Sequence, residues 1–218
     1  MSRIAPAFAL VSLLVASGVS TAHADGATDW VDVYTKQGLA VMWRAVQGTK
    51  FKEIRGVGIL PIPAEQLMAA LTDVPHYPEF MPPAVETKRI WTRGGESVFY
   101  LVVDPPVVRK RDYCVHIKVR RLPTGQLENT WRLTDDGCPP VQKGMVRMVK
   151  SEGRWLLTPQ ADGTTMVDYS GVTDPGGALP AWIVNRSTAS TLSSMFFSLA
   201  KAAATARYRG CVGESFGC

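Results

Sequence analysis

Hydrophobic positions follow three patterns along this chain: a continuous apolar stretch at the start, alternation through the middle, and helical spacing near the end. From residue 179 to about 208 the spacing predicts one long amphipathic helix. Its apolar stripe comprises Ile183, Leu192, Met195, Phe196, Leu199 and Ala203. A similar pattern over residues 30–46 predicts a first helix, which ends near Gly48.

The segment after this first helix carries signals for a strand, a short helix and a loop. Residues 51–60 alternate as a strand up to Pro61, and Pro63-Ala64-Glu65 opens a short helix through Leu71. The stretch from Asp73 to Pro83 contains four prolines. Because proline inside a helix removes a hydrogen bond and clashes with the preceding turn, we expect this stretch to be a loop.

Alternating strands fill the chain from residue 85 to 172. Two hairpins are predicted, 85–91 with 97–103 and 112–122 with 127–134, and three further strands follow at 145–150, 154–158 and 165–172. Turn residues separate the last three strands at 151–153 and 161–163. Hairpins followed by one long amphipathic helix indicate an α+β fold, with an antiparallel sheet covered by helix on one face.

The first apolar stretch is typical of a cleavable secretory signal peptide. Arg3 precedes an apolar run from Ile4 to Val19, and Ala22-His23-Ala24 is a small-residue cleavage pattern. A membrane anchor is the alternative, but the run is shorter than the roughly 20 apolar residues that a spanning helix needs. We therefore predict cleavage after Ala24, one domain over 25–208, a cysteine-containing tail over 209–218, and a location in the periplasm or outside the cell.

The charge balance argues against nucleic acid as a partner. The formal net charge is +5, or +4 once Arg3 is removed with the signal. The densest basic run, Arg109-Lys110-Arg111, is followed at once by Asp112, whereas nucleic-acid binders cluster basic residues on one face. A transient contact with an anionic membrane surface remains compatible with this charge.

All four cysteines lie beyond the predicted cleavage point, in a compartment where disulfides persist. Three pairings are possible, and we prefer Cys114 with Cys138 and Cys211 with Cys218. The spacing does not match a zinc site, and we expect no metal and no cofactor.

Strand parity points several polar residues toward the predicted core. Arg111 shares a face with Tyr113, Val115, Ile117 and Val119, and Asn129 shares one with Leu127, Trp131 and Leu133. Together with Tyr169, these polar groups could orient a mostly apolar ligand. The alternative for Arg111 is a rim cation that is paired with Asp112, Asp104 or a carbonyl, and core packing is the alternative for the other two.

Aromatic and methionine side chains could form adaptable cavity walls. The candidates are Trp91, Trp131, Trp155, Trp182, Met68, Met145, Met195 and Phe196. A completely filled core is the competing interpretation.

Several segments occur in the same order as in one known family. These are Phe51 to Gly58, Asp73 to Pro82, Pro105-Pro106-Val107 leading to Arg111-Asp112, Trp155 to Pro159, and Asp174 to Trp182 with Asn185. In these segments the chain resembles the START-domain lipid-binding family over about residues 30–208. The resemblance implies a helix-grip fold, in which a curved antiparallel sheet wraps a long carboxy-terminal helix around an apolar cavity. It also implies a gate formed by that helix and nearby loops, with the loop from Asp104 to Lys110 close to it.

The expected function is to bind, and in some settings transfer, a sterol, phospholipid or fatty acid. The expected ligand-binding residues are Arg111, Asn129, Trp131, Trp155, Tyr169, Leu192, Met195 and Phe196. One alternative is an enzyme of the polyketide cyclase or aromatase type, although neither His76 nor His116 is placed for inward acid-base chemistry. The other is a periplasmic interaction protein with a filled cavity.

Overall fold

The computed structural model describes residues 29–106 and 108–211. The predicted signal peptide and the predicted Cys211–Cys218 pairing fall wholly or partly outside these residues. The elements are β1 (Val31–Lys36), β2 (Leu39–Arg44), β3 (Glu53–Leu60), α1 (Ala64–Thr72), a 3-10 turn (Val74–His76), α2 (Tyr77–Phe80), β4 (Ala84–Arg93), β5 (Glu96–Val103), β6 (Arg111–Arg121), β7 (Leu127–Leu133), β8 (Val146–Arg147), β9 (Lys150–Pro159), β10 (Thr165–Asp174) and α3 (Ala181–Ala203).

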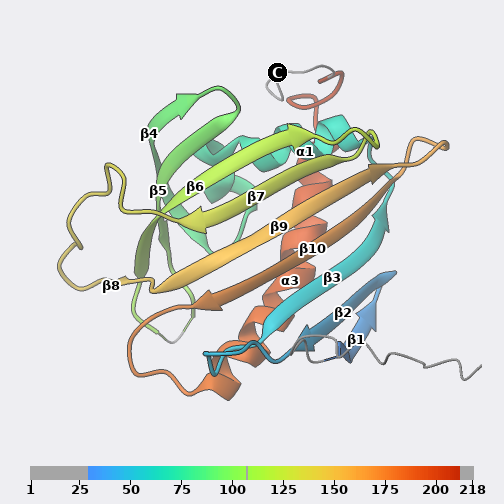
Figure 1. Ribbon diagram of the computed structural model, residues 1–218. Helices are drawn as coiled ribbons and strands as arrows, with labels where there is room; N and C mark the ends of the chain where they lie inside the picture. Colours follow the sequence, from blue (N-terminus) through green and yellow to red (C-terminus); the bar gives the residue numbers. More distant parts are fainter. Residues whose placement is uncertain (1–28, 107, 212–218) are drawn as a thin grey trace, which may run out of the picture.

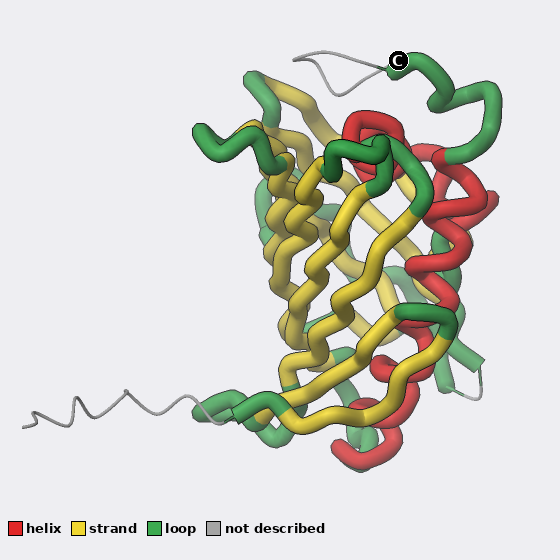
Figure 2. Tube along the Cα trace, turned by 90° about the vertical axis from the view of Figure 1, so that its right-hand side faces the viewer, coloured by secondary structure: helices red, strands yellow, loops and turns green. Residues whose placement is uncertain are grey.

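One curved sheet wraps around the long helix α3 (Figures 1 and 2). The strand order is β1-β2-β3-β10-β9-β7-β6-β5-β4, and these neighbours are antiparallel. The short β8 pairs in parallel with the start of β6. The predicted α+β helix-grip fold is therefore confirmed. None of the described helices is both long and apolar enough to span a membrane.

The predicted amino-terminal helix is wrong, because residues 31–44 form a hairpin. Gln37 and Gly38 both have positive φ, at 50° and 79°, which matches the two-residue turns that favour right-handed strand twist. In β2, Leu39 and Val41 are buried on alternate positions. The spacing of the apolar residues here fits both a helix and a strand, and the turn at Gln37 and Gly38 favours the hairpin.

Two further local predictions need correction. The proline-rich stretch forms a 3-10 turn and the one-turn helix α2, with Pro75 and Pro78 in the first helical positions, where a missing N–H costs no bond. The predicted strand at 145–150 shrinks to β8, and the predicted turn at 151–153 is continuous strand within β9. Gly153 is thus a strand glycine.

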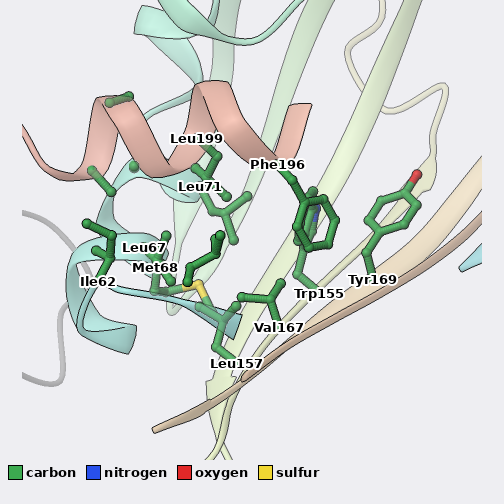
Figure 3. Close-up of a cluster of buried hydrophobic side chains, with 14 of the residues drawn as sticks. Ile62, Leu67, Met68, Leu71, Trp155, Leu157, Val167, Tyr169, Phe196 and Leu199 are labelled. Carbon is green, nitrogen blue, oxygen red and sulfur yellow. The ribbon is translucent and has the colours of Figure 1, made fainter. Parts of the chain in front are cut away.

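The carboxy-terminal half of α3 packs into a filled core. Figure 3 shows Phe196 and Leu199 facing side chains from α1, β9 and β10. Within this cluster Leu67, Met68 and Leu157 are fully buried. Close approach of the helix to β3 depends on Gly56, where a Cβ would lie 2.8 Å from Leu192 Cδ2. This half of the molecule therefore leaves little space for a ligand.

The other half of α3 is held by hydrogen bonds at its edges. The side-chain oxygen of Asn185 accepts a bond from the backbone N–H of Lys52 at 2.9 Å. The Tyr34 hydroxyl donates to the carbonyl of Ala189 at 2.7 Å and lies 2.7 Å from the Ser193 hydroxyl. These contacts fix the helix against β1 and the β2–β3 connection without filling the space beneath it.

The outer face of β6 is covered by the segment that leads into β8. Asp112 is completely buried there and accepts bonds from Arg147 Nε at 3.0 Å, Arg147 Nη2 at 3.1 Å and the Tyr100 hydroxyl at 3.2 Å. The hydrogen bond to Asp112 raises the pKa of Arg147. The predicted disulfide between Cys114 and Cys138 is present on the same face.

Candidate functional site

A cavity of about 470 Å³ lies between the inner face of the sheet and the amino-terminal half of α3. Binding sites for small molecules typically measure roughly 300–1,000 Å³. Its walls come from β5, β6, β7, β9, β10 and α3. One end, here called the loop end, is bordered by Pro105, Pro106, Val108, Pro175 and Leu179.

Small hydroxyl side chains on α3 help to leave this space open. Ser187, Thr188, Ser190 and Thr191 line the cavity. The hydroxyls of Ser187 and Thr188 donate to the carbonyl of Val184 at 3.0 and 2.8 Å, so they are satisfied within the helix. The same helix thus fills one half of the molecule with large side chains and lines the other half with small ones.

Three aromatic residues form the central wall. Trp131 stacks on Tyr169 with ring centroids 5.4 Å apart, and Trp155 meets Tyr169 edge-on at 4.7 Å. The indole of Trp131 lies against Gly153, where a Cβ would come within 2.5 Å of the ring. Its N–H donates to the Ser151 hydroxyl at 3.2 Å. The glycine therefore creates the flat surface on which this tryptophan rests.

Arg111 borders the cavity at the loop end and is only 3% exposed. Its Nη1 donates to the backbone carbonyl of Arg109, whereas its Nε has no hydrogen-bond partner among the described residues. Burial, together with the charge of Arg109, lowers the pKa of Arg111. Of the partners considered for it, the structure provides a carbonyl only, since Asp112 pairs with Arg147 and Asp104 pairs with Lys110.

Asn129 lies farther along the cavity wall and is also 3% exposed. It pairs with Val119 of β6, eight residues beyond Arg111. At roughly 3.3 Å per residue, this separation corresponds to about 26 Å along the strand. The two polar groups therefore lie far apart along the inner face.

The ionisable side chains that line the cavity are Arg111, Tyr77, Tyr113 and Tyr169. Burial raises the pKa of Tyr113 to about 12 and also raises that of Tyr169. His116 points to the outer face, 2.8 Å from Glu96, as strand parity predicts. In residues 29–106 and 108–211, no cluster of three or more potential ligands could hold a metal ion.

The structure brings seven of the eight candidate ligand-binding residues to the cavity wall. Phe196 is the exception: it is buried beside Trp155, with ring centroids 5.1 Å apart, inside the filled core. Met68 also lies in that core, while Trp91 and Met145 pack on the outer face of β5 and β6. Trp182 is 68% exposed. These last four residues therefore do not form the cavity walls that were predicted for them.

Other wall residues were not selected from the sequence. Tyr113 shares the inward face of Arg111, so strand parity could have found it. The run of serines and threonines on α3 is a second signal, because small residues on an otherwise core-facing helix indicate unfilled space. The contributions of Pro82, Pro83 and Met148 depend on how loops fold back over the sheet, which periodicity does not show.

Comparisons with known proteins agree with this architecture. The profile of the family described as polyketide cyclase/dehydrase and lipid transport matches residues 60–195. A crystal structure of a STAR-related lipid transfer protein from Xanthomonas axonopodis superposes with a TM-score of 0.74 and 26% identity, covering 81% of this chain and 99% of that one.

Two relatives by sequence add to this likeness. An uncharacterized protein of Pseudomonas aeruginosa is 30% identical over 160 residues, which are 73% of this chain and 79% of that protein. Mouse START domain-containing protein 10 is 27% identical over 190 residues, and the match covers 84% of this chain but 61% of the mouse protein.

Proposed function

This chain belongs to the polyketide cyclase/dehydrase and lipid transport family, and we propose that it binds and transfers a lipid-like apolar ligand outside the cytoplasm. The observation that carries the proposal is the cavity of about 470 Å³, walled mainly by apolar and aromatic side chains. The likeness to a STAR-related lipid transfer protein supports it. A cavity of this size is also a reason to prefer a carrier over an interaction protein with a filled core.

Binding in such a cavity is driven by removing apolar ligand surface from water, worth about 25 cal/mol per Å². No covalent chemistry is needed for this function. The ligand must still enter and leave, and the gate that we propose comprises the loop end and the first turns of α3. Two features support this placement: Pro105, Pro106 and Val108 border the cavity, and Ile183 and Val184 from the first turns of α3 also line it.

Exposed apolar side chains near the loop end support a transient contact with membranes. Trp182 at the start of α3 is 68% exposed, and Val149 is 67% exposed. Val149 lies beside the turn at Gly176, which leads into α3. Tryptophan is favoured at membrane–water interfaces. The disulfide between Cys114 and Cys138 supports a location outside the cytoplasm.

The family also includes cyclases and dehydrases, so an enzyme is the second candidate. Among the described residues, Arg111 and the tyrosines that line this cavity are the candidates for a general acid or base. A pKa of about 12 for Tyr113 disfavours proton transfer from this residue near neutral pH. We therefore place ligand binding ahead of catalysis.

The deciding experiment is to produce the chain in its native compartment, purify it without detergent and identify bound molecules by native mass spectrometry followed by organic extraction. We expect one lipid-like molecule per chain, recovered unaltered. A clean apo protein that binds no sterol, phospholipid or fatty acid would contradict the proposal. A bound polyketide that is converted to a new product would favour the enzyme.

A further inference from the structure

The guanidinium of Arg111 is a buried positive charge at the cavity wall, and no carboxylate of residues 29–106 or 108–211 pairs with it. We propose that the cavity selects amphiphiles that carry a negatively charged group, a carboxylate or a phosphate, and that Arg111 binds this group at the loop end. The inference rests on the proposed function and adds the chemical class of the ligand.

The other buried charges show how this chain normally treats such groups. Three charged side chains of the described residues are buried, namely Arg111, Asp112 and Glu128. Asp112 is paired with Arg147, and Glu128 is paired with Arg120. A buried charge is costly unless it is paired and hydrogen-bonded. Arg111 lacks such a pair within the described residues and faces the space in which a ligand would lie.

The chemistry of the guanidinium fits an anion better than a neutral polar head. Its planar array of N–H donors matches carboxylate and phosphate oxygens, and such charge-assisted bonds are about twice as strong as neutral ones. The backbone carbonyl of Arg109 uses Nη1 and leaves Nε without an acceptor. The guanidinium therefore has room for a further hydrogen-bond acceptor, and a negatively charged oxygen is the acceptor that it binds most strongly.

The position of Arg111 also orients the ligand. The wall beyond it along β6 continues with Tyr113, Val115 and Ile117, and then reaches the aromatic group around Trp131. A ligand with its anionic group at Arg111 would extend its apolar part toward Trp131 and Trp155. Asn129, about 26 Å farther along the strand, is too distant to share the same head group.

The test uses matched pairs of ligands that differ in the head group alone. Binding of the full-length mature protein is measured by titration calorimetry for palmitate against hexadecanol, lysophosphatidate against monoacylglycerol, and cholesterol sulfate against cholesterol. We expect the charged member of a bound pair to bind roughly 10- to 100-fold more tightly, as one charge-assisted contact implies. The carboxylate and phosphate arms distinguish the two sources of charge, and acetate and inorganic phosphate show whether the apolar part is required.

Variants assign the preference to Arg111. Arg111→Met should remove the 10- to 100-fold preference for the charged member of each pair. Arg111→Lys should retain part of the preference. The exposed neighbour Arg109 is the control, because Arg109→Met removes a nearby charge and should keep the preference. The comparison of paired ligands on the unaltered protein stays decisive if a variant does not fold.

Several results would overturn the inference while leaving the proposed function standing. These are equal affinity for charged and neutral members of a pair, an Arg111→Met variant that keeps the preference, tight binding of inorganic phosphate alone, or a co-purified ligand without any negatively charged group. If no amphiphile binds and none co-purifies, the proposed function itself fails and the inference falls with it.

Discussion

Arg111 and Asp112 are adjacent at the start of β6, both are buried, and they face opposite sides of the sheet. On the outer side, Asp112 receives two bonds from Arg147 and one from Tyr100. On the inner side, Arg111 donates one hydrogen bond, to the backbone carbonyl of Arg109. Within the described residues, one charge on this strand is therefore paired with an opposite charge, whereas the other has no carboxylate partner.

The largest effect on stability is expected for a substitution on the outer side of β6. Arg147→Met should lower the free energy of unfolding by roughly 3–5 kcal/mol, because Asp112 would remain buried without its cation. Urea unfolding measures this loss. Arg132→Met, at an exposed site on the adjacent strand, should change stability by about 0.5 kcal/mol or less. Equal effects of the two substitutions would show that the Asp112 pair is not structural.

The disulfide on the same side should have the next largest effect. Replacing both Cys114 and Cys138 by serine should cost roughly 3 kcal/mol, because the bond closes a loop across a sequence separation of 24 residues. Urea unfolding of the double variant and of the unaltered protein measures this difference. Ligand affinity should remain within about threefold, since neither cysteine borders the cavity. A large loss of affinity would mean that the two sides of β6 are coupled.

A smaller effect is expected in the inner wall. Gly153→Ala would place a Cβ 2.2 Å from the Ser170 carbonyl oxygen and 2.5 Å from Trp131, so it should destabilise the protein by roughly 1–3 kcal/mol. Displacement of Trp131 should also weaken ligand binding. Glu152→Ala, at the exposed neighbouring position, is the control, with an expected change of about 1 kcal/mol or less. Urea unfolding and ligand titration of both variants measure the two effects, and equal results for the two would show that Gly153 is not required for either stability or binding.

The smallest effect on stability is expected at Arg111 itself. Arg111→Met should change the free energy of unfolding of the ligand-free protein by about 1 kcal/mol or less, or increase it, because an apolar side chain removes a buried charge that no carboxylate of the described residues pairs. The measurement is urea unfolding after removal of bound lipid. A loss as large as that of Arg147→Met would show that Arg111 has a structural role.

Much of the fold could be predicted because the hairpins and the last helix have strong periodicity and clear turn residues. The first hairpin was missed because the apolar residues of 30–46 fit a helix as well, and the Gln37-Gly38 turn is a weaker signal than an Asn-Gly pair. Gly153 looked like a turn residue, yet its role is to accommodate Trp131 from the neighbouring strand. That role depends on a contact across strands, which a sequence pattern does not contain.

Strand parity placed Arg111, Asn129, Trp131 and Tyr169 on the inner face, where the structure has them, and Trp155 was expected there as an aromatic wall residue. The helical spacing of α3 did not show that Phe196 lies outside the cavity, because its apolar stripe passes from the cavity into the filled core without any change in spacing. Strand parity also could not show that Asp112, on the outer face of β6, is buried. The cover over Asp112 comes from the segment that leads into β8, where Arg147 lies 35 residues after Asp112 in the chain.

The two halves of α3 should also differ in how readily their backbone opens. Serine and threonine are poor helix formers, and the cavity removes packing from one side of the first turns, whereas Phe196 and Leu199 anchor the last turns in the core. Amide hydrogen exchange should therefore be fast near Ile183 and slow near Leu199. A single helix would then carry a gradient of protection, with its least protected end beside the cavity and its most protected end in the core.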